Sequence, residues 1–177
     1  MTTERTNPDH PNSSLPNPGP PNPGAPSPGD PDPVRAHENS RPVEGSDPVF
    51  GELMADVMAS AEHFGHREHI RLTWLAVHHV GMPAAIDLIS DGIRRTARYA
   101  GAPQKYNATV SRAWVELVAH HAAEEDTRSF PDLVGRNPAL LDKRLLGRFY
   151  RSGTLARPEA RTGWVEPDLA PFPWATD

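Results

Sequence analysis

The sequence contains no cysteine. That absence excludes disulfide bonds, thiolate metal sites and cysteine nucleophiles, and it fits a reducing compartment. No apolar run approaches the roughly 20 residues that a membrane-spanning helix needs. The first residues also lack the apolar run and small-residue cleavage site of a secretory signal. We therefore expect a cytoplasmic protein with no membrane partner.

Basic residues are too few and too scattered to form a phosphate-binding stripe. Lys and Arg total 18 against 23 Asp and Glu, which gives a formal net charge of -5 and a sequence pI of about 6.0. Nucleic acid is therefore not an expected partner. The local group of Arg94, Arg95 and Arg98 is interpreted as a solvated helix face.

The signals for a sheet are also missing. No segment combines strict two-residue alternation with enrichment in β-branched residues, so no strand is predicted. The sequence has no nucleophile elbow, phosphate-cradling glycine loop, dinucleotide fingerprint or EF-hand loop. The missing motifs argue against several common enzyme classes. The missing strand signals favour an all-α fold.

Proline is abundant and unevenly placed. Of 21 prolines, 11 precede residue 34, and almost no large apolar side chain accompanies them. Burial within this segment cannot offset the entropy of ordering it, so residues 1–46 are predicted to form a disordered Pro/Gly-rich tail. One interpretation of the tail is functional, as a ligand for a proline-binding module or as a spacer. The other is a segment with no specific partner. Residues 47–177 are predicted to form one helical domain with an extended C-terminal segment.

Apolar residues recur at helical spacing in five segments of that domain. Asp47 and Asn107 are placed to cap helix starts, Pro48 and Pro83 to occupy first turns, and Gly81 and Gly101 to end helices. The five predicted helices run from Asp47 to about Ala61, from His66 to about Val80, from Pro83 to about Ala100, from Asn107 to about Glu124, and from Asn137 to Phe149, with Ser152-Gly153 closing the last.

Two shorter features complete the expected bundle. Residues around Phe130 and Val134 are predicted to form a short turn or helix. The segment from Pro158 to Asp177 is expected to lie extended over the bundle, with a short helix at Pro158 to Arg161. The fold class is therefore a single-domain bundle of about five helices.

The strongest candidate site lies at the start of the second predicted helix. His66 and His69 are three residues apart, so both imidazoles share one helical face. Histidine titrates near neutral pH and is the commonest metal ligand. The pair therefore suggests acid–base chemistry or a divalent metal site, with Glu68 alongside. Further ligands would come from Glu68, Glu116 or a histidine of the fourth helix.

Structural roles compete with each of these assignments. His66 could instead cap its helix, and His69 could be a core histidine bonded to a carbonyl oxygen. His78-His79 and His120-His121 fall near helix C-termini, where the dipole favours a cation, and a surface role is preferred for both pairs. Trp74 and Trp114, both at helical spacing, are more often core residues than ligand platforms.

The segment from Phe64 to Trp74 follows the pattern F-x-H-x-x-H-x-R-x-x-W, and Lys105 to Thr109 follows K-Y-H-x-T, whose histidine is Asn107 here. An N-P-x-L-L segment begins at Asn137, and an A-R…P-D tail begins at Ala160. Through these motifs the chain resembles, across roughly residues 50 to 170, a family of small, largely uncharacterised bacterial proteins. The resemblance implies a site built from the start of the second helix and from the connector between Lys105 and Thr109. With a histidine at position 107 the family pattern would complete a three-histidine metal site, and asparagine is a poorer transition-metal ligand.

Two functions follow as expectations. The first is a small-molecule enzyme, fitting specialised-metabolite biosynthesis in a bacterium, with its pocket between the second and fourth helices. The second is a non-catalytic helical binding or scaffold protein with structural histidines. In the enzyme, His66 or His69 acts as general acid or base, assisted by Glu68 and Tyr106. The predicted substrate-binding residues are Arg71, which would hold an anionic group, together with Trp74, Asn107, Thr109 and Trp114.

Overall fold

Helix-start and helix-end signals in the sequence set the bounds of the long helices. The computed structural model describes residues 47–124 and 127–175, so the predicted tail at 1–46 lies outside the described residues. The α-helices are α1 (Pro48–Met58), α2 (His66–Val80), α3 (Met82–Tyr99), α4 (Ala108–Ala122), α5 (Phe130–Arg136), α6 (Ser152–Leu155) and α7 (Pro158–Thr162). The 3₁₀ helices are η2 (Pro103–Lys105), η3 (Pro138–Leu141), η4 (Leu145–Arg148) and η5 (Pro173–Ala175). The described part is helical without strands, which confirms the predicted all-α class.

The predicted caps have clear counterparts in the structure. The Asp47 carboxylate accepts a hydrogen bond from the Val49 N–H at 2.8 Å, and Asn107 Oδ1 accepts from the Val110 N–H at 3.0 Å. Gly81 separates α2 from α3 with φ at 77°, a conformation that costs glycine little. Four of the predicted helices therefore begin and end within a few residues of where the sequence places them.

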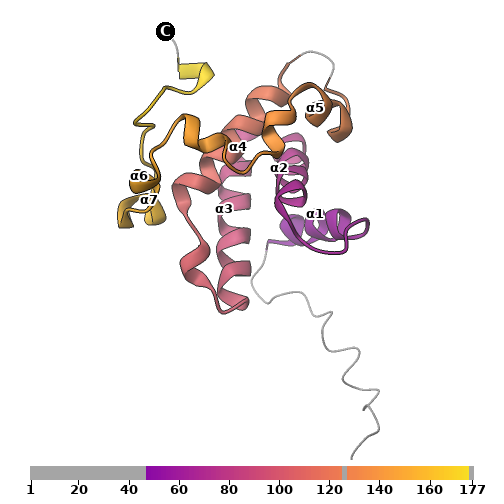
Figure 1. The fold of residues 1–177 in the computed structure, drawn as a ribbon. Coiled ribbons are helices and arrows are strands. Elements are labelled where there is room, and N and C mark those ends of the chain that lie inside the picture. The colour runs from indigo at the N-terminus through magenta and orange to yellow at the C-terminus, as the bar shows by residue number, and fades with distance from the viewer. Residues whose placement is uncertain (1–46, 125–126, 176–177) are drawn as a thin grey trace, which may run out of the picture. The chain divides into compact units, whose positions relative to one another are not determined.

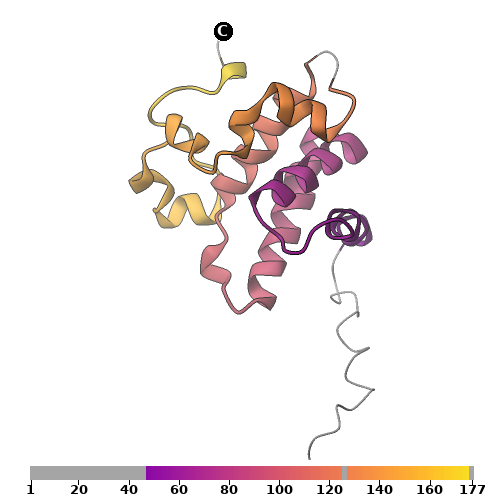
Figure 2. The ribbon, with the colours of Figure 1, turned by 45° about the vertical axis from the view of Figure 1, so that its right-hand side comes forward.

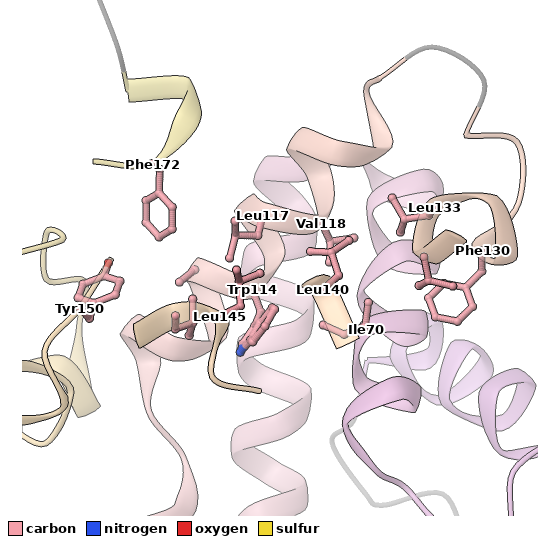
Figure 3. Close-up of a cluster of buried hydrophobic side chains, with 13 residues drawn as sticks. Ile70, Trp114, Leu117, Val118, Phe130, Leu133, Leu140, Leu145, Tyr150 and Phe172 are labelled. Carbon is pink, nitrogen blue, oxygen red and sulfur yellow. The ribbon is translucent and has the colours of Figure 1, made fainter. Parts of the chain in front are cut away.

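The helices pack around α2 and α4, which contribute to two groups of buried side chains (Figures 1 and 2). One group joins α1, α2, α3 and α4 through Phe50, Leu72, Ile89 and Val115. The other joins α2, α4, α5 and the C-terminal segments (Figure 3). Its labelled members are Ile70, Trp114, Leu117, Val118, Phe130, Leu133, Leu140, Leu145, Tyr150 and Phe172. Among the described residues, no helix has the length and apolar character needed to cross a bilayer.

The predicted fifth helix is wrong. In place of one helix from Asn137 to Phe149, the chain forms η3 and η4, separated by an extended Asp142 whose ψ is 111°. The Asp142 carboxylate accepts a hydrogen bond from the Arg144 N–H at 2.9 Å, an aspartate turn that competes with helix. The helix is predicted because Leu141, Leu145 and Phe149 are spaced at i, i+4 and i+8. The buried leucines of this segment are instead Leu140, Leu145 and Leu146.

The C-terminal part follows the prediction more closely. Ser152-Gly153 begins the short α6 rather than closing a helix, which corrects the expected boundary. The short helix predicted at Pro158 to Arg161 is α7, and an extended segment follows it to η5. In both ribbon views α6 and α7 lie on the opposite side of α4 from α1 (Figures 1 and 2). Tyr150 secures this part through its hydroxyl, which donates to the Val165 carbonyl oxygen at 2.9 Å.

Candidate functional site

His66 is the first residue of α2 and makes a long-range contact. Its Nε2 donates a hydrogen bond to the Leu140 carbonyl oxygen at 3.0 Å, and its ring meets the Trp114 ring edge-on at 4.8 Å between centroids. Partial burial lowers the pKa of His66 below 6.5. The imidazole does not cap its own helix, as one interpretation of the sequence had it. It ties α2 to η3.

His69 lies one turn further along the same face. Its Nε2 is inaccessible to solvent and has no hydrogen-bond partner in the protein, although the residue keeps some exposed surface. Burial lowers the pKa of His69 to about 4, with the charge of His66 contributing in the same direction. The ring is therefore neutral at physiological pH. The carbonyl bond expected of a structural His69 is absent.

Glu68 acts on the backbone at the start of α2. Its Oε2 accepts a hydrogen bond from the Gly65 N–H at 3.0 Å, which is the carboxylate half of a capping box. Gly65 has no side chain to return the second bond. This contact explains why α2 begins where it does without a serine, threonine or aspartate at its N-cap.

Arg71 and Trp74 belong to one cleft with Glu68. The cleft has a volume of about 570 Å³ and lies between the end of α1, one face of α2 and the start of α5. Its lining residues are Val57, Ser60, Ala61, Arg67, Glu68, Arg71, Trp74, Leu75, Ser129, Phe130 and Pro131. The volume falls in the range of ordinary small-molecule sites. We call it the α1–α2–α5 cleft.

Two of the three charged residues that line this cleft are arginines. Arg71 donates to Ser60 Oγ at 2.6 Å and approaches Asp56 Oδ2 at 3.4 Å, which links α2 to the end of α1. The Arg67 guanidinium lies 5.3 Å from the centroid of the Phe130 ring. Trp74 lies 6.2 Å from Phe130 between ring centroids, and its indole N–H is buried and unpaired. Cationic and aromatic groups therefore line the same cleft.

The remaining predicted site residues lie elsewhere. Tyr106 lines a separate cleft of about 400 Å³ with Arg94, Arg98 and Arg161. Trp114 is a core residue, only 5% exposed. The expected pocket between α2 and α4 is occupied by this packing, and the cleft that Arg71 and Trp74 line is formed with α1 and α5 instead.

Asn107 and Thr109 hold the C-terminal segments. Besides capping α4, Asn107 donates from Nδ2 to the Leu155 carbonyl oxygen at 2.8 Å. The buried Thr109 hydroxyl donates to the Gly163 carbonyl oxygen at 2.7 Å and accepts from the Val165 N–H at 3.1 Å. The hydrogen bonds of both side chains are therefore made to backbone groups of this protein, and the geometry supports a structural role for them.

Metal binding requires at least a third ligand near His66 and His69. Glu68 bonds the Gly65 N–H, and Glu116 pairs with Arg112 at 2.6 Å. Across residues 47–124 and 127–175, only one set of three histidine or acidic side chains has ligand atoms within 4.8 Å of one another. That set is His120, His121 and Glu124. The spacing i, i+1, i+4 at the end of α4 was visible in the sequence, where a surface role was preferred.

Comparison with known proteins adds no relative. No family model matches the chain, and no curated protein or solved structure is similar enough to count as a match. The resemblance drawn from the histidine and K-Y-x-x-T patterns therefore stays a prediction. Functional inference rests on the geometry of the clefts and side chains.

Proposed function

We propose that this protein binds a small organic anion with a flat apolar body in the α1–α2–α5 cleft. The observation that carries the proposal is the shared location of Arg67, Arg71, Trp74 and Phe130 on one cleft of about 570 Å³. A guanidinium pairs with a carboxylate through two parallel hydrogen bonds, and the aromatic rings offer area for an apolar ring.

The charges of the cleft select the sign of the ligand. The charged residues that line the cleft are two arginines and one glutamate. The carboxylate of that glutamate, Glu68, already accepts a hydrogen bond from the Gly65 N–H. Arg71 is only partly exposed, its side chain retaining 30% of its accessible surface. A ligand carboxylate that reaches Arg71 would compete with Asp56, whose Oδ2 lies 3.4 Å from the guanidinium. Because Asp56 is more exposed than Arg71, this ion pair is weak. A monoanion fits this balance better than a neutral or cationic ligand.

The histidines are structural in this proposal. Neither His66 nor His69 is among the residues that line the cleft. The His66 ring is committed to the Leu140 carbonyl oxygen and to Trp114. The proposal thus corresponds to the non-catalytic binding protein among the two expected functions.

An acid–amide comparison tests the proposal. A library of small aromatic carboxylic acids, each beside its primary amide, is screened by ligand-observed NMR, and hits are measured by isothermal titration calorimetry. We expect acids to bind and amides to bind at least 10-fold more weakly, because one charge-assisted pair contributes about 1.5–3 kcal/mol. Equal affinity of acids and amides would remove the role of the arginines.

Variants separate direct contact from structural support. Arg71→Gln should weaken acid binding about 10-fold or more, whereas Arg94→Gln, which removes an exposed guanidinium paired with Asp91, should not. Asp56→Asn is the more informative control. It removes the partner of Arg71 and should leave acid binding unchanged or stronger, because the guanidinium is released. Weaker binding in Asp56→Asn would mean that Arg71 serves only to hold α1.

A second candidate function is the small-molecule enzyme, and the unpaired Nε2 of buried His69 favours it. Buried polar atoms without partners are uncommon, and a catalytic role is one explanation for such an atom. In this role neutral His69 would accept a proton from a substrate that reaches Nε2. His69→Gln would then abolish turnover of any substrate found while leaving its binding intact, whereas a structural His69 predicts loss of stability alone.

A further inference from the structure

Two adjacent histidines in the last turn of α4 lie close to an acidic residue that follows the helix. His121 Nδ1 donates a hydrogen bond to Glu124 Oε1 at 2.9 Å. The ring of His120 lies 5.1 Å from that of His121 between centroids. One ring nitrogen from each histidine and one carboxylate oxygen lie within 4.8 Å of one another. This cluster is outside the α1–α2–α5 cleft, and its members are half-buried or exposed.

The distances are close to those that a metal ion imposes. With Zn–N bonds of about 2.0–2.1 Å, ligand atoms of a tetrahedral site lie about 3.3 Å apart. The His121–Glu124 pair is already nearer than that. The remaining separations, which are at most 4.8 Å, would have to shorten when a metal binds. The side chains concerned are at least partly exposed, Glu124 retaining 45% of its side-chain surface, so they have room to rotate.

The C-terminal segment restrains one of the ligands. Trp174 lies 5.2 Å from His120 between ring centroids, and it stacks on Phe172 at 4.6 Å with an interplanar angle of 6°. Phe172 is itself buried, only 2% exposed. The His120 ring is therefore held by an aromatic stack anchored in the core, which lowers the entropy lost when a metal fixes the ring.

The donor set favours a transition metal over Mg²⁺ or Ca²⁺. Two imidazole nitrogens and one carboxylate oxygen suit Zn²⁺, whereas Mg²⁺ and Ca²⁺ prefer oxygen ligands alone. The partial negative charge at the C-terminus of α4, a helix of 15 residues, adds to the charge of Glu124.

We propose that His120, His121 and Glu124 bind a Zn²⁺ ion with three protein ligands. A tetrahedral ion held this way retains one coordination position for water or an exogenous ligand. The site is independent of the proposed carboxylate cleft, so either can fail without the other.

The chain provides a matched control. His78 and His79 form the same adjacent pair at the end of α2. There, however, His78 Nδ1 donates to the Trp74 carbonyl oxygen at 3.0 Å. No third histidine or acidic ligand atom within residues 47–124 and 127–175 joins that pair. A histidine pair without a carboxylate is thus available in the same molecule.

The test uses the full chain without an affinity tag, stripped of metal with EDTA and titrated with ZnCl₂ by calorimetry. We expect one site per chain, weakened at least 10-fold by His121→Ala and by Glu124→Gln, and changed less than twofold in the His78→Ala/His79→Ala double variant. An equal loss in the control variant, or no saturable binding by the wild type, would overturn the proposal.

A second readout locates the ion without relying on affinity. Paramagnetic Co²⁺ bound at this site should quench Trp174, so metal-dependent quenching should fall in Trp174→Phe and disappear in Glu124→Gln at the same Co²⁺ concentration. Quenching that persists unchanged in both variants would place the metal elsewhere and contradict the assignment.

Discussion

Replacing Gly92 by alanine should destabilise the protein, although the same replacement in most helices stabilises. Gly92 is buried in α3, where the Phe50 side chain of α1 packs directly on it. A Cβ atom at this position would lie 2.0, 2.2 and 2.4 Å from three atoms of the Phe50 ring. Atoms cannot approach this closely, so the ring or α1 as a whole must move.

The magnitude follows from two opposing effects. Alanine gains about 1 kcal/mol over glycine inside a helix. Overpacking a core site costs about 1–3 kcal/mol, and displacing Phe50, now only 6% exposed, forfeits up to about 3 kcal/mol of apolar burial. The steric effect wins, and we expect the free energy of unfolding to fall by about 1–2 kcal/mol. Because Val57 of α1 lines the cleft and Ser60 follows directly after this helix, displacement of α1 would reach the ligand site.

Urea denaturation followed by far-UV circular dichroism measures this change. Gly51→Ala is the matched control, because a Cβ there meets no atom within 4 Å and should give the usual stabilisation of about 0.5–1 kcal/mol. In a Phe50→Ala background the clash is gone, so Gly92→Ala should become stabilising, with a coupling energy of about 2 kcal/mol. Stabilisation by Gly92→Ala in the wild-type background would refute the packing of α1 on α3.

Three further predictions concern residues expected from the sequence to form the site. His69 has a pKa of about 4 when folded against 6.5 when unfolded, so the unfolded chain binds more protons between these values. Stability should therefore fall as pH drops from 6.5 to 4, by on the order of 3 kcal/mol, and denaturation of His69→Gln should lack this component. Asn107→Ala should cost about 2 kcal/mol by removing the α4 cap and the bond to Leu155, whereas Asn107→Ser, which can cap but not reach Leu155, should cost about half of that in thermal denaturation. Thr109→Val should cost about 2–4 kcal/mol and raise hydrogen exchange at Val165, while Thr109→Ser keeps the hydroxyl and should slow that exchange again; unchanged exchange in Thr109→Val would contradict the role of this hydroxyl.

The local part of the fold could be read from the sequence. Asp47-Pro48, Gly81, Gly101 and Asn107 each mark a helix end because capping and positive φ are local properties of the chain. The segment after Asn137 could not be read in this way. There Asp142 forms a local turn, and the leucines are buried by contact with distant elements, so periodicity suggested a helix that does not form.

The candidate site was predictable to a similar degree. Glu68, Arg71 and Trp74 lie three residues apart in turn, and that spacing is enough to place them along one side of α2. Whether a side chain faces a cleft or another part of the chain depends on long-range contacts. Asn107 and Thr109 are bound to Leu155, Gly163 and Val165, roughly 50 residues away, and no local pattern reveals this.

The most direct test of the proposed function is to map where an aromatic carboxylate binds. Amide and indole resonances of the ¹⁵N-labelled protein are followed while the tightest-binding acid from the screen is added. The cleft predicts shifts confined to residues 57–61, 67–75 and 129–130, with the indole N–H of Trp74 among them. Shifts centred instead on Tyr106, Arg94 and Arg98, or the absence of any bound acid, would contradict it.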